Sequence, residues 1–349
     1  MRDDITGLLI GDPHLMSEAP LASMLVIEET LRLVKEKSPD FVVVMGDTLH
    51  FHSRADITPI KWATNWFQEL QKIAPTYVLI GNHDLKDPGQ FLTEEHCFYA
   101  NKFIESGPQI IDKVVKVDIK GYNLIMMPYV PPGRMMEALG TIGITEENIT
   151  DQQIDAIFCH QDVEAVIKGI DWDGDKWLAC NPMVYSGHIH HYMKVLNNWL
   201  YVGSSRQVSC AEDPPKTVSF VTFKHEDQCE IRLKLNVPIK QKIEINASEF
   251  KAGKYPLPAF NKMVSYYIYV IGEIAMVEAL KKSKAHKTWK LSRKDIMVNY
   301  PPLKSKDAPG NELISRIDGV KSYRDVLLEK VKGTEMEQDL KDILQSLRT

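Results

Sequence analysis

An α/β fold is predicted by three features of the sequence. The first half alternates short apolar runs with amphipathic stretches, these follow a β-α-β-α-β order, and each apolar run leads into a glycine and a polar residue. The expected strands are Gly7–Ile10, Phe41–Met45 and Thr76–Ile80, with helices at Leu21–Lys37 and Thr58–Ile73 between them. Ligands of open α/β sheets bind at the carboxyl ends of strands, so the loops after these runs should converge.

Further strands are expected along the chain, and the pattern changes near residue 246. β-rich runs occur at Lys113–Ile119, Tyr122–Met127, Ala156–Phe158, Met183–Tyr185, Trp199–Val202 and Val218–Phe223. After a linker at Tyr255–Pro258, a small β-α-β unit is expected from Met263–Val270, Ile274–His286 and Asp295–Tyr300, and then two helices at Tyr323–Val331 and Met336–Leu347. We therefore expect a first domain over 1–245, a β-α-β capping domain over 255–303 and a helical segment over 310–349.

The composition narrows the functional classes. With 42 Lys and Arg against 47 Asp and Glu, the chain is not basic overall, so contact with nucleic acid would depend on local basic patches or metal ions. The five cysteines form no Cys-x-x-Cys pair, which is typical of free thiols in a reducing compartment. Neither a signal peptide nor an apolar stretch of membrane-spanning length is evident, and we expect a cytoplasmic protein without membrane contact.

Asp, Asn and His residues gather after the expected strands. In chain order these motifs are Asp12-x-His14, Gly46-Asp47, Gly81-Asn82-His83-Asp84, His160 and Gly187-His188-x-His190. Taken singly, a loop charge, a helix cap or a hydrogen-bonded core histidine would explain most of them. A carboxylate has two oxygens with which to bridge two cations, and histidines two positions apart project to the same side of an extended chain. Five such motifs, each at a strand end, make a metal centre the better explanation.

In this order the motifs resemble the calcineurin-like metallophosphoesterase superfamily, and within it the SbcD-like nucleases that repair DNA double-strand breaks in bacteria and phages. The closer resemblance is carried by His50 in Gly-Asp-Thr-Leu-His, by Cys159-His160-Gln161 and by Tyr201–Ser205. The Gly-Asp-x-x-Asp-Arg-Gly motif of protein serine/threonine phosphatases is absent from the sequence. The resemblance spans residues 5–225 and implies a four-layer αββα sandwich, here with a small β-α-β capping domain and C-terminal helices.

Two divalent metal ions are implied by the resemblance. One would be bound by Asp12, His14, Asp47 and His190, and the other by Asp47, Asn82, His160 and His188, so that Asp47 bridges them. Such ion pairs clamp the attacking and leaving oxygens of an in-line displacement at phosphorus. Because the ligands are carboxylate, imidazole and amide without thiolate, manganese is the expected metal, with zinc and iron left open.

Three further residues have catalytic roles by resemblance. His83 matches a histidine that is not a ligand but stabilises the transition state or protonates the leaving oxygen, a role suited to imidazole near neutral pH. Asp84 would orient His83 or the adjacent loop. His50 matches the position that handles the scissile phosphate in the nucleases, and His52 is a nearby competitor for that role.

The resemblance also implies the partners. DNA would be the substrate, cleaved by exonuclease and endonuclease action, and an SbcC-like ATPase would bind a C-terminal helical segment. The sequence has no Gly-x-x-x-x-Gly-Lys-Ser/Thr motif, so any ATP dependence would come from such a partner. The apolar faces of the two C-terminal helices would suit either that docking or packing on the chain itself. Whether the chain forms a homodimer stays open.

Two other functions remain open at this stage. A calcineurin-like enzyme acting on cyclic nucleotides or phosphomonoesters would need neither His50 nor the appended β-α-β unit. A non-catalytic scaffold of the same fold would not need the complete set of ligands that is present here.

Overall fold

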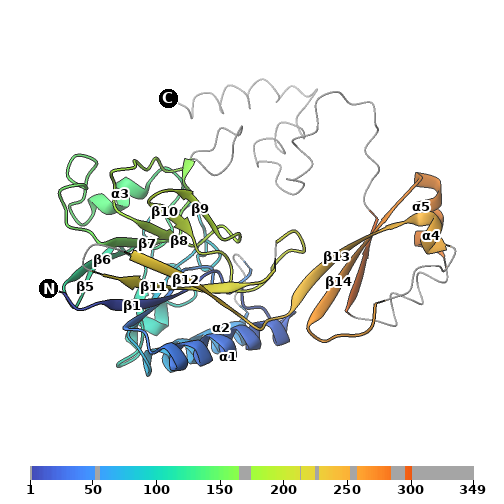
Figure 1. The fold of residues 1–349 in the computed structure, drawn as a ribbon, viewed down its shortest axis with the longest axis horizontal. Coiled ribbons are helices and arrows are strands. Elements are labelled where there is room, and N and C mark those ends of the chain that lie inside the picture. The colour runs from blue at the N-terminus through green and yellow to red at the C-terminus, as the bar shows by residue number, and fades with distance from the viewer. Residues whose placement is uncertain are drawn as a thin grey trace, which may run out of the picture. The chain divides into compact units, whose positions relative to one another are not determined.

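The computed structural model describes residues 2–51, 56–164, 174–212, 214–224, 228–251, 258–283 and 295–300. This part of the chain contains two six-stranded sheets and a separate three-stranded sheet, with helices between the strands (Figure 1). The α/β class predicted from the sequence is therefore confirmed.

The first sheet has the order β12-β11-β1-β2-β3-β4. Its strands are β1 (Ile5–Ile10), β2 (Phe41–Val44), β3 (Thr76–Leu79), β4 (Gln109–Ile111), β11 (Thr217–Phe223) and β12 (Gln228–Lys234). Strands β1 to β4 are parallel, whereas β11 and β12 add antiparallel pairs beside β1. The sequence pattern did not indicate β12, because this edge strand is largely exposed and polar and lacks an apolar run.

The second sheet has the order β5-β6-β7-β8-β10-β9. Its strands are β5 (Val115–Ile119), β6 (Tyr122–Met126), β7 (Ala156–Cys159), β8 (Val184–Ser186), β9 (Met193–Leu196) and β10 (Trp199–Tyr201). The four central strands are parallel, and β5 and β9 pair antiparallel at the edges. Strand β9 was not expected, because its short run alternates with exposed lysine.

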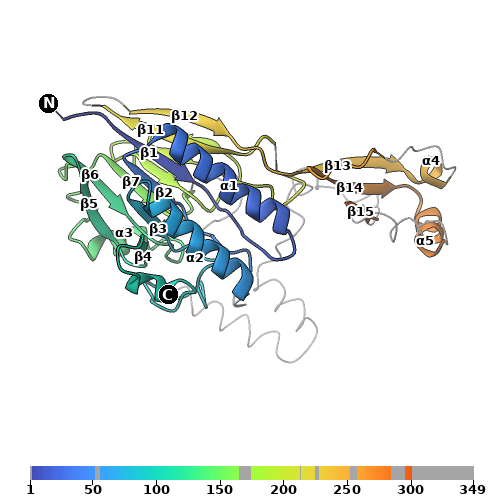
Figure 2. The ribbon, with the colours of Figure 1, turned by 90° about the horizontal axis from the view of Figure 1, so that it is seen from below.

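Helices α1 (Pro20–Lys37) and α2 (Ile57–Gln71) lie side by side over the first sheet (Figure 2). Proline stands in the first turn of α1, where its missing N–H is harmless, and Asp56 caps α2 by accepting a hydrogen bond from the Thr58 N–H at 3.0 Å. The two helices are joined by the Trp66 indole N–H, which donates to Thr30 Oγ1 at 3.1 Å. Both helices therefore pack on the outer face of the first sheet.

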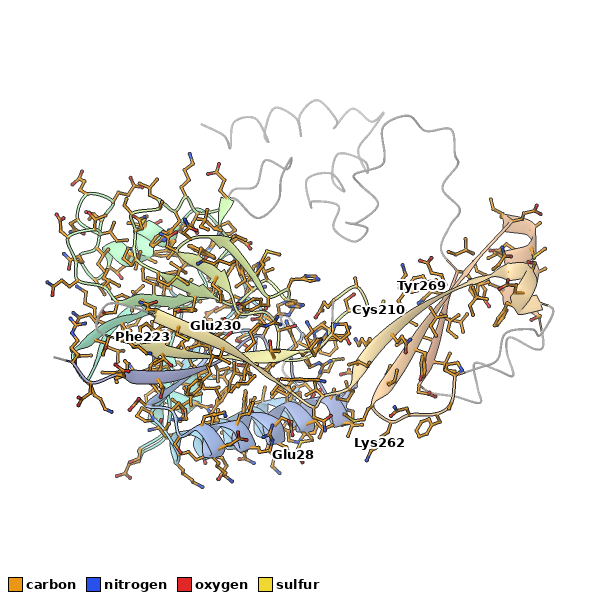
Figure 3. The ribbon with its side chains drawn as sticks, viewed as in Figure 1. Glu28, Cys210, Phe223, Glu230, Lys262 and Tyr269 are labelled. Atoms are coloured by element: carbon orange, nitrogen blue, oxygen red, sulfur yellow. The ribbon has the colours of Figure 1, made fainter. Side chains whose placement is uncertain are left out.

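The two sheets pack face to face. Side chains from both form the apolar core between them, including Phe41, Phe158 and Phe223. Phe223 is labelled in Figure 3. Helix α3 (Met135–Gly140) packs with the other face of the second sheet, where Met135 and Leu139 join a separate apolar cluster. The order helix, sheet, sheet, helix is the αββα sandwich that the sequence resemblance implied.

The three-stranded sheet has the order β13-β14-β15, with all three strands parallel. It consists of β13 (Ile239–Asn246), β14 (Val264–Ile271) and β15 (Ile296–Asn299), with α4 (Ala247–Lys251) and α5 (Ile274–Lys282). The expected β-α-β order of β14, α5 and β15 is present. Strand β13 was not recognised in the sequence, because polar residues such as Lys240, Lys242 and Glu244 interrupt its apolar pattern. From the sequence, its residues were expected within the first domain.

Some expectations fall outside the described residues. They include both C-terminal helices, most of the linker that begins at Tyr255, and the competing His52. Among the helices that are described, none combines the length and apolar character needed to cross a membrane.

Candidate metal centre

Five loops at strand carboxyl ends bring the predicted ligands together. They follow β1, β2 and β3 of the first sheet and β7 and β8 of the second. The loops approach so closely that glycine is required before the functional residues. A Cβ on Gly81 would lie 2.2 Å from the Asp47 backbone nitrogen, and one on Gly46 would lie 2.4 Å from His160 Nδ1.

The first group of converging ligand atoms belongs to Asp12, His14 and His190. Nε2 of His14 lies 2.9 Å from Nε2 of His190, and Asp12 Oδ2 is 3.7 Å from that same His190 nitrogen. Asp47 Oδ2 approaches from the other side, 3.8 Å from His14 Nε2. The structure therefore places side by side the four residues expected around one ion.

The second group is Asp47, His160 and His188, with Asn82 beside them. Asp47 Oδ1 is 3.3 Å from His160 Nε2, while its Oδ2 faces the first group. Asn82 Oδ1 lies 3.1 Å from His160 Nε2 and 2.9 Å from His188 Nδ1. The two oxygens of Asp47 thus face different groups, as expected of a bridging carboxylate.

Hydrogen bonds outside the groups select the ring nitrogens that face inward. His160 Nδ1–H donates to the Met45 carbonyl at 2.7 Å, His188 Nε2–H to Asp162 at 3.1 Å and His190 Nδ1–H to Glu212 at 3.1 Å. This tautomer assignment follows from the partners and leaves a lone pair on each inward nitrogen. Polarising partners of this kind are typical of histidines that bind metals.

The charges of the centre also fit cations. Asp12 and Asp47 are almost fully buried. Burial is the largest effect on the pKa of Asp12 and raises it, with a further rise from the charge of Asp47. Burial also raises the pKa of Asp47, but the neighbouring His160, His14 and His83 together outweigh burial and hold that pKa well below its usual value. Two buried carboxylates this close require positive charge, which divalent cations supply.

Backbone conformation marks the same residues. Asp12, His14, Asp47 and His188 all have positive φ, at 32°, 44°, 47° and 75°. Left-handed backbone is unfavourable for residues with a Cβ, and it is retained mainly where function requires a particular side-chain direction. Four of the seven predicted ligands therefore occupy strained positions that their residue types alone do not indicate.

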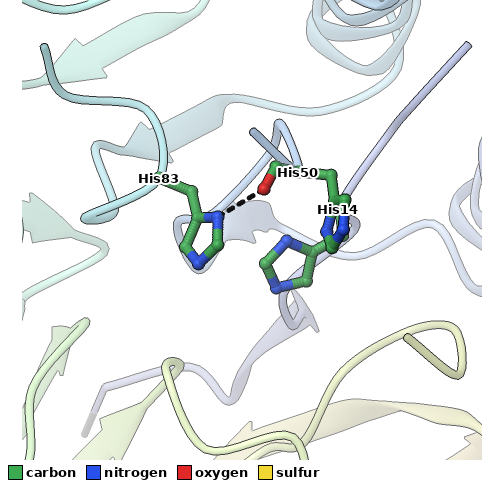
Figure 4. Close-up of side chains that lie close together, drawn as sticks. All are labelled: His14, His50 and His83. Atoms are coloured by element: carbon green, nitrogen blue, oxygen red, sulfur yellow. Dashed lines mark hydrogen bonds between the residues drawn. The ribbon is translucent and has the colours of Figure 1, made fainter. Parts of the chain in front are cut away.

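His83, His50 and His14 form a third group whose ring nitrogens converge (Figure 4). The His83 Nδ1–H donates to the backbone carbonyl of His50 at 2.5 Å, and its Nε2 lies 3.8 Å from Asp47 Oδ2. The backbone carbonyl of His50 therefore orients the His83 ring, and the imidazole of His50 takes no part in this contact. Its ring lies 5.3 Å from that of His14, measured between centroids.

Asp84 organises the loops rather than the His83 ring. Its carboxylate accepts hydrogen bonds from the backbone N–H groups of Thr48, Leu49 and Gly81 at 3.0–3.2 Å. Burial, followed by the charge of Asp47, raises its pKa to about 7. Of the two roles expected for Asp84, the geometry supports the one that joins the loops after β2 and β3.

Three residues near the centre were missed by the sequence analysis. Glu212 and Asp162 hold the outer nitrogens of His190 and His188, and the buried guanidinium of Arg206 donates from Nη1 to the His14 carbonyl at 3.0 Å. Glu212 also contacts Lys216 Nζ at 2.6 Å. These residues stand outside the strand-end motifs, and only the fold brings them to the ligands.

Removing these supporting carboxylates should weaken each ion separately. In Glu212→Gln the His190 site should lose 10- to 100-fold in metal affinity, the usual scale for such a partner, and Asp162→Asn should affect the His188 site instead. Stepwise manganese titration by calorimetry, with metal content measured by mass spectrometry, checks this. If both variants lower the affinity of the same ion, the division into two groups is wrong.

Comparison with known proteins gives the family of this chain. Residues 6–192 match the family model described as Calcineurin-like phosphoesterase. The viral protein named "Putative phosphoesterase 078R" of Invertebrate iridescent virus 3 is 30% identical over 349 residues, covering 99% of this chain and 97% of its own. "Putative phosphoesterase 244L" of Invertebrate iridescent virus 6 is 32% identical over 291 residues, 81% of this chain and 99% of its own.

Among solved structures, a protein of unknown function, AQ665 from Aquifex aeolicus, is similar over 46% of this chain and 81% of its own. The identity is 15% and the TM-score 0.27.

Proposed function

This chain belongs to the calcineurin-like phosphoesterase family, and we propose that it is a dinuclear-metal phosphodiesterase that cleaves DNA. The observation that carries the proposal is the pair of ligand groups facing opposite oxygens of Asp47. Asp12, His14 and His190 would hold one ion with Asp47, and Asn82, His160 and His188 the other. The ions, for which manganese is our choice, would activate a water nucleophile and neutralise the charge that develops on the phosphoryl oxygens.

His83 is proposed as the proton donor to the leaving oxygen. Its Nδ1–H is fixed by the His50 carbonyl, so the ring presents Nε2 toward the centre, beside Asp47. Since Nδ1 keeps its proton for the His50 carbonyl, Nε2 donates from the imidazolium form, which an imidazole reaches readily near neutral pH. Asp84 keeps the loop that carries His83 in register with the loop that carries Asp47 through its three backbone hydrogen bonds.

Positive charge near His50 supports an extended anionic substrate. The pKa of His50 is lowered first by burial and then by the charges of Arg206 and Lys240. Lys240 comes from β13 of the three-stranded sheet, and its ammonium donates to the Val208 carbonyl. The three-stranded sheet therefore contributes a cation whose charge acts on His50. Such charges attract the phosphates of a nucleic acid, as the resemblance to the SbcD-like nucleases leads us to propose.

The remaining assignments are proposals from the same resemblance. They are the domains over 1–245, 255–303 and 310–349, an SbcC-like ATPase partner, action within the cytoplasm, and both exonuclease and endonuclease cleavage. The segment expected to bind the partner lies outside the described residues.

The test compares substrates with purified, manganese-loaded protein. Linear duplex DNA, single-stranded DNA, bis-p-nitrophenyl phosphate and p-nitrophenyl phosphate are incubated separately. We expect hydrolysis of DNA and of the diester. Hydrolysis of the monoester alone would overturn the diesterase assignment, and cleavage of the diester without DNA would favour a small substrate such as a cyclic nucleotide. If metal is bound and none of the substrates is hydrolysed, the result would favour a non-catalytic scaffold of the same fold.

A further inference from the structure

A cavity of about 380 Å³ lies beside His83. It is formed by the loop after β2 and the segment after β3, and apolar side chains and His83 make most of its wall: Leu49, Phe51, His83, Leu85, Cys97 and Tyr99. Its volume falls within the range of small-ligand pockets. His83, the proposed proton donor, therefore lies beside Asp47 of the metal centre and also lines this apolar cavity.

Charged groups at this cavity neutralise one another. Lys86 Nζ lies 2.9 Å from Glu95 Oε2, and Glu94 Oε1 is 2.8 Å from Lys102 Nζ. Glu94, Glu95 and Lys86 are also exposed to solvent. Lys86 is the lysine among the described lining residues, and it could hold a phosphate in the cavity only by giving up its ion pair with Glu95.

Buried polar groups of the cavity are already used within the fold. The Asp84 carboxylate accepts its three backbone hydrogen bonds. His96 Nε2 lies 3.2 Å from Asp112 Oδ2, and His96 Nδ1 accepts from the Phe98 N–H at 3.2 Å. These side chains therefore contact an occupant mainly through van der Waals interactions, because their hydrogen-bonding atoms already have partners in the fold. An occupant that is itself uncharged and flat matches this lining best.

We infer that this cavity binds the aromatic ring of a substrate residue next to the scissile phosphate, which for DNA is an unstacked base. The inference rests on the proposed diesterase function, because it places the phosphate at the metal ligands and the ring beyond His83. Phe51 and Tyr99 supply aromatic walls, and the Phe51 ring lies 4.9 Å from that of His50, measured between centroids. A base enters such a cavity only when it leaves the stack, so single strands and unpaired ends are preferred over duplex.

Equilibrium binding separates the ring from the phosphate. Thymidine 5′-monophosphate and 2-deoxyribose 5-phosphate carry the same phosphate and differ in the base. We expect the manganese-loaded protein to bind the former about tenfold more tightly in calorimetric titrations, within the range that stacking on one aromatic side chain supports. Phe51→Ala and Tyr99→Ala should each remove most of that preference while affinity for the sugar phosphate is retained.

Phe260→Ala provides the control. Phe260 is an exposed phenylalanine, at 71%, and is not a lining residue of the cavity. Its substitution should keep the preference. Equal binding of the two phosphates by the unmodified protein, or a preference that survives in both wall variants, overturns the inference. Hydrolysis of bis-p-nitrophenyl phosphate in the same preparation tests the diesterase function separately, since it depends on no contact with a base.

Discussion

Asp47→Asn is expected to lower kcat/KM for bis-p-nitrophenyl phosphate by roughly 10³-fold, the scale seen when one preorganised electrostatic group is removed. The two carboxylate oxygens face different groups, 3.8 Å from His14 Nε2 and 3.3 Å from His160 Nε2. An amide is uncharged and has a single oxygen, so it cannot present one anionic oxygen to each group. The Asp47 Oδ1 atom also accepts the His83 N–H at 2.8 Å, so the same change loosens the loop that carries His83.

Metal content should fall together with activity in this variant. Asp40→Asn is the matched control, because Asp40 immediately precedes β2 whereas Asp47 follows it, and Asp40 pairs with Lys120 at 2.7 Å outside both ligand groups. Both variants are compared by mass spectrometry of bound manganese and by thermal unfolding. Full metal occupancy with retained activity in Asp47→Asn would contradict the bridging role.

The sequence predicted the inner strands of the sandwich and the convergence of the residues that follow them, for a shared physical reason. Buried parallel strands such as β2 and β3 appear as unbroken apolar runs, and the residue that follows each run is placed by the end of that strand. Asp47 and Asn82 could therefore be assigned to one edge of one sheet. Exposed strands such as β12 and β13 carry polar residues on much of their surface and give no comparable signal.

What the sequence could not provide is long-range placement. Glu212 holds His190 from 22 positions away in the chain, and Asp162 reaches His188 across 26 positions. Each is an ordinary acidic residue by sequence and gains its role only from the loop that positions it. The positive φ of Asp12 and His188 is likewise imposed by the surrounding fold. The contact between the His50 backbone carbonyl and His83 could not be predicted either, because any residue at position 50 would supply the same carbonyl.

His83→Gln is expected to lower the rate on DNA by about 10³-fold while bound metal is unchanged, because general acid catalysis contributes 10²- to 10⁴-fold. In the structure, His83 Nδ1 lies 2.5 Å from the His50 carbonyl. His83 is in neither of the two groups described around Asp12 and Asp47, but its ring nitrogens converge with those of His14 and His50. Glutamine fills similar space and keeps a donor for that carbonyl, but it cannot release a proton to a departing alkoxide.

The leaving group distinguishes this role from a structural one. Nitrophenolate departs without protonation, so His83→Gln should retain most of its activity on bis-p-nitrophenyl phosphate while losing it on DNA. His191→Gln, at an exposed histidine adjacent to a ligand, should behave as the unmodified protein on both substrates. Equal losses on the two diesters would mean that His83 acts on the phosphoryl group itself. Loss of manganese would instead make it a ligand, and either result would replace the proton-donor assignment, because only proton donation depends on the basicity of the departing oxygen.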